Sequence, residues 1–507
     1  MTTFPPPFAR ARPSRLQRPL CCALAGGALT VALLALGGCS SLLVHPSTDV
    51  AAAVALPAGW DQGSASTDPT ALAQWWQRFG DPQLAELVTR AMTYNTDVRT
   101  AQASLRQARE QGVIAASGLY PNVGASASAS RSKNGRNDTA TSYGAGIDAS
   151  WEPDIFGGTA AQVAAADATT RATALSLASL QVSIAGEVAA QYITWTGLSL
   201  RLAIARDNLA SQEETQQIAE WRAQAGLTTS LDVEQARTST ETTRAQIPAL
   251  TSSIAQAQNA LAILAGTTPE ALNATLRKNA VVPVADDNLA YAFPAETLRQ
   301  RPDVRQAEAQ VVAAAAQVTA ADAARYPSFN LAGSLGVSAL TFAGLTGGSS
   351  LAASILGGVS VPIFNAGALA AQVRVQEASL DQARIAYEAT VLGALKEVED
   401  ALVALRSARE RLATLRRAAE SARNASLLAR YRYNSGLIDF TAVLQTQLSL
   451  LSVQDSVANG EAELAIAHVR LYKALGGGWQ PGSELTAGAA SAAPPAAIAP
   501  SSLAPTS

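Results

Sequence analysis

The residue with the most recognisable chemistry is Cys39, which ends the run Leu36-Gly37-Gly38-Cys39. Arginines and then an apolar stretch precede it, as in a secretory signal peptide. An apolar residue, two small residues and a cysteine form a lipobox, whose thiol receives diacylglycerol. Two or more acyl chains anchor a protein stably. Ser40 follows instead of Asp, which favours the outer membrane. We predict a signal peptide over 1–38 and covalent lipid on Cys39; an ordinary signal peptide or one transmembrane anchor is the alternative.

Groups that could support catalysis or bind a metal are scarce. The 507 residues include two histidines and three cysteines, and every cysteine lies at or before Cys39. Neither a metal cluster nor a disulfide framework is therefore available. The net charge of −3 argues against binding to nucleic acid. We expect no enzymatic activity, no cofactor besides the lipid and no nucleic-acid partner, and we expect His468 to be packed in the last helix.

Two glycine turns, Gly226-Leu227 and Gly436-Leu437, carry the other candidate side chains. Each turn follows a long helical stretch and starts another, so both reverse the chain at one end of the helices. Polar residues gather beside them: Arg222 and Asp232 at the first, and Arg430, Tyr431 and Asp439 at the second. A ring of carboxylates in a narrow pore biases passage by charge. The same residues also suit an ordinary solvated turn, and both interpretations stay open.

Long helices must position these turns. Residues 159–224 and 367–434 contain almost no helix breakers, and each would be roughly 100 Å long at about 1.5 Å per residue. In the second stretch, apolar residues alternate at spacings of mostly four and three: Val391, Leu395, Val398, Leu402, Leu405 and Leu412. This spacing indicates a coiled-coil seam. A cytosolic coiled coil would show the same seam, but the strands described next count against it.

Four runs alternate between an apolar face and a face of small polar residues. They cover about 121–131, 143–153, 328–338 and 355–364. Each has the length of a tilted strand that crosses a membrane, with lipid outside and water inside. A half-buried soluble sheet is the alternative. Four strands cannot close a barrel, and open strand edges are not tolerated in lipid. Copies of the chain must therefore pool their strands.

The chain is also an internal duplication with a period near 206–211 residues. For example, Tyr120-Pro121 aligns with Tyr326-Pro327, and Ala225-Gly226-Leu227 aligns with Ser435-Gly436-Leu437. The expected organisation therefore has four parts after the signal peptide: a lipidated, extended segment over 39–80, a first repeat over 81–275, a second repeat over 276–480, and a disordered Ala/Pro/Ser tail over 481–507.

Together these features resemble the outer-membrane factor (TolC-like) family of tripartite efflux pumps, in its NodT-type lipoprotein branch. The resemblance covers about Trp75 to Trp479 and rests on five stretches: Trp75-Trp76-Gln77-Arg78-Phe79-Gly80-Asp81-Pro82, Arg301-Pro302-Asp303-Val304, Pro362-Ile363-Phe364-Asn365-Ala366-Gly367, Arg430-Tyr431 with Asn434-Ser435-Gly436, and Leu471-Tyr472-Lys473-Ala474-Leu475-Gly476-Gly477-Gly478-Trp479. It implies an α+β membrane protein, in which a homotrimer forms a 12-stranded β-barrel, four strands per chain, continuous with a long periplasmic α-helical coiled-coil barrel.

The resemblance also implies partners and roles. The partners are a periplasmic adaptor, an inner-membrane resistance-nodulation-division (RND) transporter and outer-membrane lipid. The function is a passive duct that exports drugs or other small toxic compounds to the exterior, and a type I protein-secretion duct is the alternative. The implied periplasmic gate is Asp439, Arg430, Tyr431, Asp232 and Arg222. The expected adaptor-docking tip is Gly226, Leu227, Gly436 and Leu437.

Overall fold

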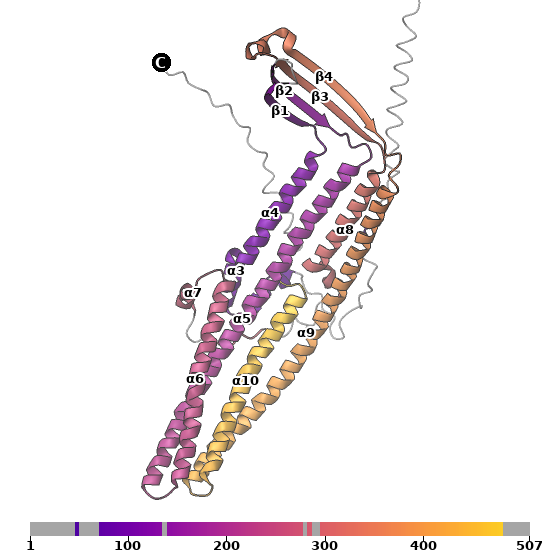
Figure 1. The fold of residues 1–507 in the computed structure, drawn as a ribbon. Coiled ribbons are helices and arrows are strands. Elements are labelled where there is room, and N and C mark those ends of the chain that lie inside the picture. The colour runs from indigo at the N-terminus through magenta and orange to yellow at the C-terminus, as the bar shows by residue number, and fades with distance from the viewer. Residues whose placement is uncertain (1–45, 50–69, 134–138, 277–280, 286–294, 480–507) are drawn as a thin grey trace, which may run out of the picture. The chain divides into compact units, whose positions relative to one another are not determined.

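Figure 1 shows a computed structural model of the chain, which describes residues 46–49, 70–133, 139–276, 281–285 and 295–479. Contacts divide the chain into two compact units. The first contains residues 1–48, 111–167 and 312–381, and the second contains 49–110, 168–311 and 382–507. The predicted signal peptide, Cys39 and the predicted tail 481–507 lie outside the described residues.

The first unit contains one antiparallel sheet of four strands in the order β1-β2-β3-β4 (Figure 1). The strands are β1 (Asn122–Ser132), β2 (Ala140–Trp151), β3 (Ser328–Ala339) and β4 (Leu351–Ser360). Four strands were expected, and four are present in the described part of the chain. β4 starts four residues earlier than predicted, because the loop-like residues Ala352 and Ala353 still pair with Gly336 and Leu335. It also ends four residues earlier, so 361–364 lie outside the strand, and β2 starts three residues earlier than predicted.

The register gives the sheet two chemically different faces. One face carries apolar rows, such as Ala125–Ile147–Leu335–Ala353. The other carries small and polar rows, such as Gly124–Asp148–Ser334–Ser354. Ser334 and Ser354 Oγ atoms are 2.7 Å apart across the strands. The alternation in the sequence therefore predicted correctly which residues share a face.

The helices repeat in length as the duplication predicts. The two longest have 67 residues each, α5 (Gly158–Gln224) and α9 (Ala368–Asn434), and each is followed by a helix of 35 residues, α6 (Ser230–Leu264) and α10 (Phe440–Ala474). The shorter helices are α2 (Thr70–Ala73), η2 (Trp75–Phe79), α3 (Pro82–Tyr94), α4 (Thr96–Ser117), α7 (Pro269–Thr275), η4 (Ala295–Gln300), α8 (Pro302–Ala323), η5 (Phe342–Thr346) and η6 (Gly348–Ser350).

The predicted seam of α9 is the side that packs. Val391, Val398 and Leu405 are each less than 5% exposed. Among the described residues, α5 is the one helix with a stretch long and apolar enough to cross a membrane, and half of that stretch is buried within the protein. A window of this kind is typical of a core helix as well, so it does not by itself indicate a membrane span.

The two motifs that lie farthest apart in the sequence form one cluster in the second unit. The Trp75 ring is fully buried and stacks on Tyr472, with ring centres 5.5 Å apart. The Gly478 amide donates to the Leu72 carbonyl at 2.9 Å. The segment 39–80 was predicted to be extended, but its described end is helical over α2 and η2. Burial of the large apolar side chains of Trp75, Trp76 and Phe79 accounts for the difference.

At equivalent positions in the two repeats, a side chain donates a hydrogen bond to the carbonyl at the end of the equivalent helix. Asn95 Nδ2 donates to the Leu264 carbonyl at the end of α6, at 3.0 Å. At the aligned position, Arg301 Nη1 donates to the Ala474 carbonyl at the end of α10, at 2.6 Å. Terminal helix carbonyls otherwise have no partner within the helix. The repeat seen in the sequence is thus also a repeat of contacts.

Candidate functional site

The candidate site is the pair of helix turns, residues 221–232 and 430–440, which we call the turn region. Both turns close in the same way. The Leu227 amide donates to the Arg222 carbonyl, and the Leu437 amide donates to the Arg432 carbonyl, each at 2.8 Å. Gly226 and Gly436 have φ of +75° and +73°. Glycine adopts this left-handed conformation without strain, so it ends each helix.

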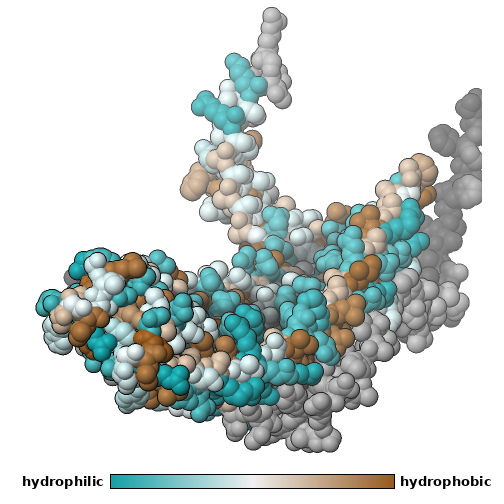
Figure 2. All heavy atoms as spheres, turned by 90° about the horizontal axis from the view of Figure 1, so that it is seen from below, coloured by the Kyte–Doolittle hydropathy of each residue, from teal (hydrophilic) through white to brown (hydrophobic). Residues whose placement is uncertain are grey.

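The leucines after these glycines face solvent. Leu227 is 77% exposed and Leu437 is 72% exposed. In this type of turn the residue after glycine commonly packs on an apolar residue one helical turn back. Here Arg222 and Arg432 are the residues whose carbonyls accept from the leucine amides, and the aromatic residues just before them, Trp221 and Tyr431, are themselves 60% and 63% exposed. Figure 2, viewed from below Figure 1, shows apolar residues in brown among polar residues in teal at the end where the turns lie. Exposed apolar residues of this kind suit contact with a partner.

Arg222 connects the two turns. Its guanidinium lies over the Tyr433 ring, 4.4 Å from the ring centre. It also donates to the Tyr433 and Asn434 carbonyls at 3.4 Å. Tyr433 in turn contacts Phe440, with ring centres 5.2 Å apart. The end of α5 is therefore held against the end of α9 by one cation–π contact and two long hydrogen bonds.

Arg430 and Tyr431 have different surroundings. Arg430 Nη2 forms an ion pair with Glu214 Oε2 on α5, at 3.1 Å. Tyr431 is 63% exposed. The buried positions of α9 near this end are Ser426 and Ala429, and the same spacing leads to Tyr433. Sequence reasoning therefore missed Glu214 and Tyr433, although continuing the seam would have found Tyr433.

Asp232 and Asp439 are not equivalent. Asp439 is the first residue before α10, and its side chain makes no capping hydrogen bond. Its aligned counterpart is Thr229, which caps α6 in a capping box with Asp232. The Asp232 carboxylate accepts from the Thr228 hydroxyl and from the Thr229 amide. Asp232 thus stabilises the start of a helix, whereas the Asp439 carboxylate is exposed and uncommitted to a cap.

The hydrogen bond from Thr228 is the main reason that the pKa of Asp232 lies below its ordinary value of 3.8. Because this pKa is lower in the folded state, ionised Asp232 stabilises the fold above about pH 4. That contribution is lost as the pH falls through the folded pKa. The capping box of α6 should therefore stay intact at neutral pH.

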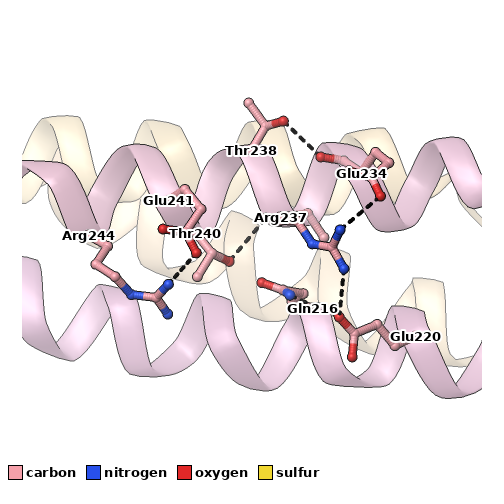
Figure 3. Close-up of polar contacts among 9 residues, drawn as sticks. Gln216, Glu220, Glu234, Arg237, Thr238, Thr240, Glu241 and Arg244 are labelled. Carbon is pink, nitrogen blue, oxygen red and sulfur yellow. Dashed lines mark hydrogen bonds and ion pairs between the residues drawn. The ribbon is translucent and has the colours of Figure 1, made fainter.

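Ion pairs hold α5 and α6 together along the exposed side, as Figure 3 shows. Arg237 contacts Glu234 at 3.1 Å on its own helix and Glu220 of α5 at 3.9 Å. Arg244, one heptad further along, contacts Glu241 and reaches Glu213 of α5 at 2.8 Å. Exposed pairs of this kind each contribute about 0–1 kcal/mol. They therefore add little to the stability of the contact between the two helices.

Beneath the turn region, α5, α6 and α10 share a layer of buried polar side chains. The layer follows the apolar cluster of Ala219, Ala236, Phe440 and Leu444 and consists of Gln212, Thr215, Ser239, Thr240, Thr243 and Gln447. Gln447 Nε2 donates to Thr215 Oγ1 at 2.9 Å. Gln447 Oε1 and both polar atoms of Gln212 have no protein partner among the described residues.

A buried polar atom without a partner costs about 1–3 kcal/mol. Contact between α5 and α10 therefore costs more at this layer than at the apolar cluster beside it. Separation of the helices would return those atoms to water. Direct bonds between α5 and α10 continue farther from the turns, where Asn208 Nδ2 donates to Gln454 Oε1 at 2.8 Å and Arg201 Nε contacts Asp455 Oδ1 at 2.6 Å. The turn region thus combines polar links at the end of the helices with a weakly held layer behind them.

The described residues of the turn region do not bring together a set of side chains of the kind used in catalysis. Among the described residues, no group of three or more His, Cys, Asp or Glu side chains could hold a metal ion. His468, expected to be packed, is 2% exposed, and its Nδ1 lies 2.9 Å from the Leu464 carbonyl.

Comparison with known proteins gives one consistent result. The profile of the family described as outer membrane efflux protein matches residues 87–267 and again 293–477. The pyoverdine export outer membrane protein OpmQ of Pseudomonas putida is 33% identical over 440 residues, which cover 84% of this chain and 93% of OpmQ. The solvent efflux pump outer membrane protein SrpC of Pseudomonas putida is 32% identical over 88% of this chain and 97% of SrpC.

A solved structure of the outer-membrane channel OprN superposes with a TM-score of 0.76. The two chains are 33% identical, and the match covers 86% of this chain and 100% of OprN. The matches to sequence and to structure each include both repeats.

Proposed function

The chain belongs to the outer membrane efflux protein family, and from this premise we propose that three copies of it form the outer-membrane duct of a tripartite efflux pump. Membership makes the chain an outer-membrane component of an export system. The relatives are channel and export proteins, and we extend this to a passive duct that carries out no enzymatic reaction and needs no cofactor beyond lipid on Cys39.

The observation that carries the proposal is the four-stranded sheet with one apolar face. In the described residues, β1 pairs only with β2 and β4 pairs only with β3, so both edges are open. Open edges cannot remain unpaired in lipid. If β1 of one copy pairs with β4 of the next, three copies close a twelve-stranded barrel whose apolar face meets lipid. Such a barrel closes only when all three copies contribute their strands.

The partners follow from the same premise. A duct in the outer membrane receives cargo from the inner membrane through other proteins, so we propose a periplasmic adaptor and an RND transporter as partners. Exposed Leu227 and Leu437, placed by Gly226 and Gly436, are the proposed adaptor contacts. The pyoverdine and solvent export of the relatives supports small compounds as cargo.

We propose that the turn region is the periplasmic gate. Arg222 and Arg430 hold α5 against α9 within each chain. Asp439, three copies of which would face one another in the trimer, supplies the charge at the opening. Tyr431, exposed on the single chain, is available to a neighbouring copy. The buried polar layer beneath lets these helices part at low cost.

Replacement of Asp439 by Ala should increase the single-channel conductance in planar bilayers. The reason is that the variant removes a carboxylate from the gate without removing a helix cap. Asp232→Ala is the matched control, because it removes an equal charge whose role is capping. Asp232→Ala should lower the free energy of unfolding by about 1 kcal/mol with little change in conductance. Unchanged conductance in Asp439→Ala would remove Asp439 from the gate.

Deletion of the gene tests the proposed cargo class against protein secretion. We expect the deletion strain to become more susceptible to antibiotics and solvents and to retain a fluorescent dye, while its set of secreted proteins stays the same. Complementation with the intact gene should restore resistance. Unchanged susceptibility together with the loss of a secreted protein would instead establish the type I secretion duct.

A further inference from the structure

The small polar face of the sheet carries one charged residue in the four described strands of a chain. In the four described strands the charged residues are Arg131 and Asp148. Arg131 alternates with Val123, Ala125, Ala127 and Ala129, so it belongs to the apolar face, near the end of β1. Asp148 therefore stands alone on the other face, in the row Gly124–Asp148–Ser334–Ser354.

The surroundings of Asp148 leave its carboxylate open. A hollow of about 360 Å³ lies against it, and most of the residues that line the hollow belong to the small polar face, among them Asn122, Ser150, Ser334 and Ser354, together with the larger Leu356. Asp148 is exposed and has no ion-pair or hydrogen-bond partner among the described residues. Glycines occupy Gly124, Gly146 and Gly336 around it, and the one large apolar side chain that lines the hollow, Leu356, lies in the next row, Asn122–Ser150–Ala332–Leu356.

The face that holds this hollow is the one that must face inward. Lipid cannot accommodate an unpaired carboxylate at low cost, whereas a water-filled lumen can. The opposite face consists of apolar rows such as Ala125–Ile147–Leu335–Ala353. The hollow and the distribution of charge thus agree on the same inner face.

We propose that Asp148 is the residue that sets ion selectivity in the membrane-spanning part of the duct. The proposal rests on the proposed trimer, in which three Asp148 carboxylates lie at one level of the barrel. Twelve strands about 4.8 Å apart and tilted by about 40° give a backbone diameter of about 24 Å. Each carboxylate then lies about 9 Å from the axis, comparable to the distance over which salt screens a charge at 0.1 M.

The geometry predicts a preference that depends on salt. In about 0.1 M KCl, three charges at this radius should favour K⁺ over Cl⁻ by about five-fold, and in about 1 M KCl the preference should almost vanish. Cationic and neutral cargo would pass this level more easily than anionic cargo of the same size. Because the other residues in the row of Asp148 are small, the discrimination is by charge and not by fit.

The test is the reversal potential of the full-length protein in planar bilayers under a KCl gradient. Asp439→Ala serves as the background, so that the carboxylate proposed to supply the charge at the gate opening is absent. We expect Asp148→Asn to bring the permeability ratio close to one, Asp148→Lys to favour Cl⁻, and Asp148→Glu to retain the preference for K⁺. Ser334→Lys, which places a cation beside an intact Asp148, should also bring the ratio towards one.

The outcomes separate the two proposals. Normal channels whose ratio is the same in the background, Asp148→Asn and Ser334→Lys would overturn the role of Asp148 and leave the duct intact. If the background protein forms no channel in bilayers, both the duct and the role of Asp148 fall. If Asp148→Asn fails to assemble, the Ser334→Lys result alone decides.

Discussion

Replacement of Ile147 by Arg should abolish assembly of the protein in the outer membrane. Ile147 lies in the middle of β2, between Ala125 and Leu335 on the apolar face, and is 51% exposed on the single chain. An arginine facing lipid near the bilayer centre costs about 2–4 kcal/mol. Three copies would pay this cost at once, which makes the total comparable to the stability of a whole domain.

The matched control is Ser126→Arg, on the neighbouring strand but on the small polar face, opposite Gly146. It should assemble nearly as well as the unmodified protein, because its side chain would enter water. The measurement is the amount of folded oligomer in purified outer membranes, together with the urea midpoint after folding into vesicles. Equal assembly of Ile147→Arg and Ser126→Arg would show that the apolar face does not meet lipid.

The second large effect is expected at Arg301, which is 7% exposed. It donates to Ala474 and contacts Asp303 at 2.6 Å and Glu397 at 2.8 Å. Burial lowers the pKa of the guanidinium, but the bonds and charges of Asp303 and then Glu397 outweigh burial and raise the pKa above its ordinary value. Arg301→Ala should lower the free energy of unfolding by about 3 kcal/mol, because it leaves Asp303 and a helix-end carbonyl unpaired.

Thermal unfolding followed by far-UV circular dichroism measures this loss. Arg416→Ala is the control, since Arg416 is 59% exposed and contacts Glu461 at 2.8 Å on the surface. That variant should lose less than about 1 kcal/mol. Arg301→Lys should fall between the two, because an ammonium group cannot reproduce the two-pronged contact with Asp303. Equal losses in Arg301→Ala and Arg416→Ala would contradict the role of Arg301 as a fastener of α10.

Much of the fold was predictable because its signals are periodic. Alternation along β1 to β4 gave the two faces of the sheet, and the seam of Val391, Val398 and Leu405 gave the buried side of α9. Strand limits were less accurate. Polar or small residues such as Ser142 and Ala352 resemble a loop in the sequence but are held in the ladder by their partners. The helical end of the segment 39–80 depends on Tyr472, almost four hundred residues away, which no local pattern reveals.

The candidate site was predictable in position but not in contacts. The glycine turns located it, and Arg222 does lie between the two turns. The packing of α5 against α9 decides which acidic side chain each arginine contacts. The ion pair of Arg430 with Glu214 therefore could not be predicted from the spacing of residues in the sequence. Asp232 and Asp439 looked alike in the sequence because each follows a glycine turn. Relative to the start of the following helix, Asp232 lies three residues later than Asp439. Asp232 is therefore a capping partner, whereas the Asp439 side chain makes no capping hydrogen bond and is exposed.

The central claim is that one chain is a third of a duct. Native mass spectrometry of the full-length protein, released from a lipid nanodisc, tests it most directly. We expect the mass of three lipidated chains, with no population of single folded chains in lipid. A single chain that remains folded in the bilayer, or a complex of any other number of copies, would contradict it.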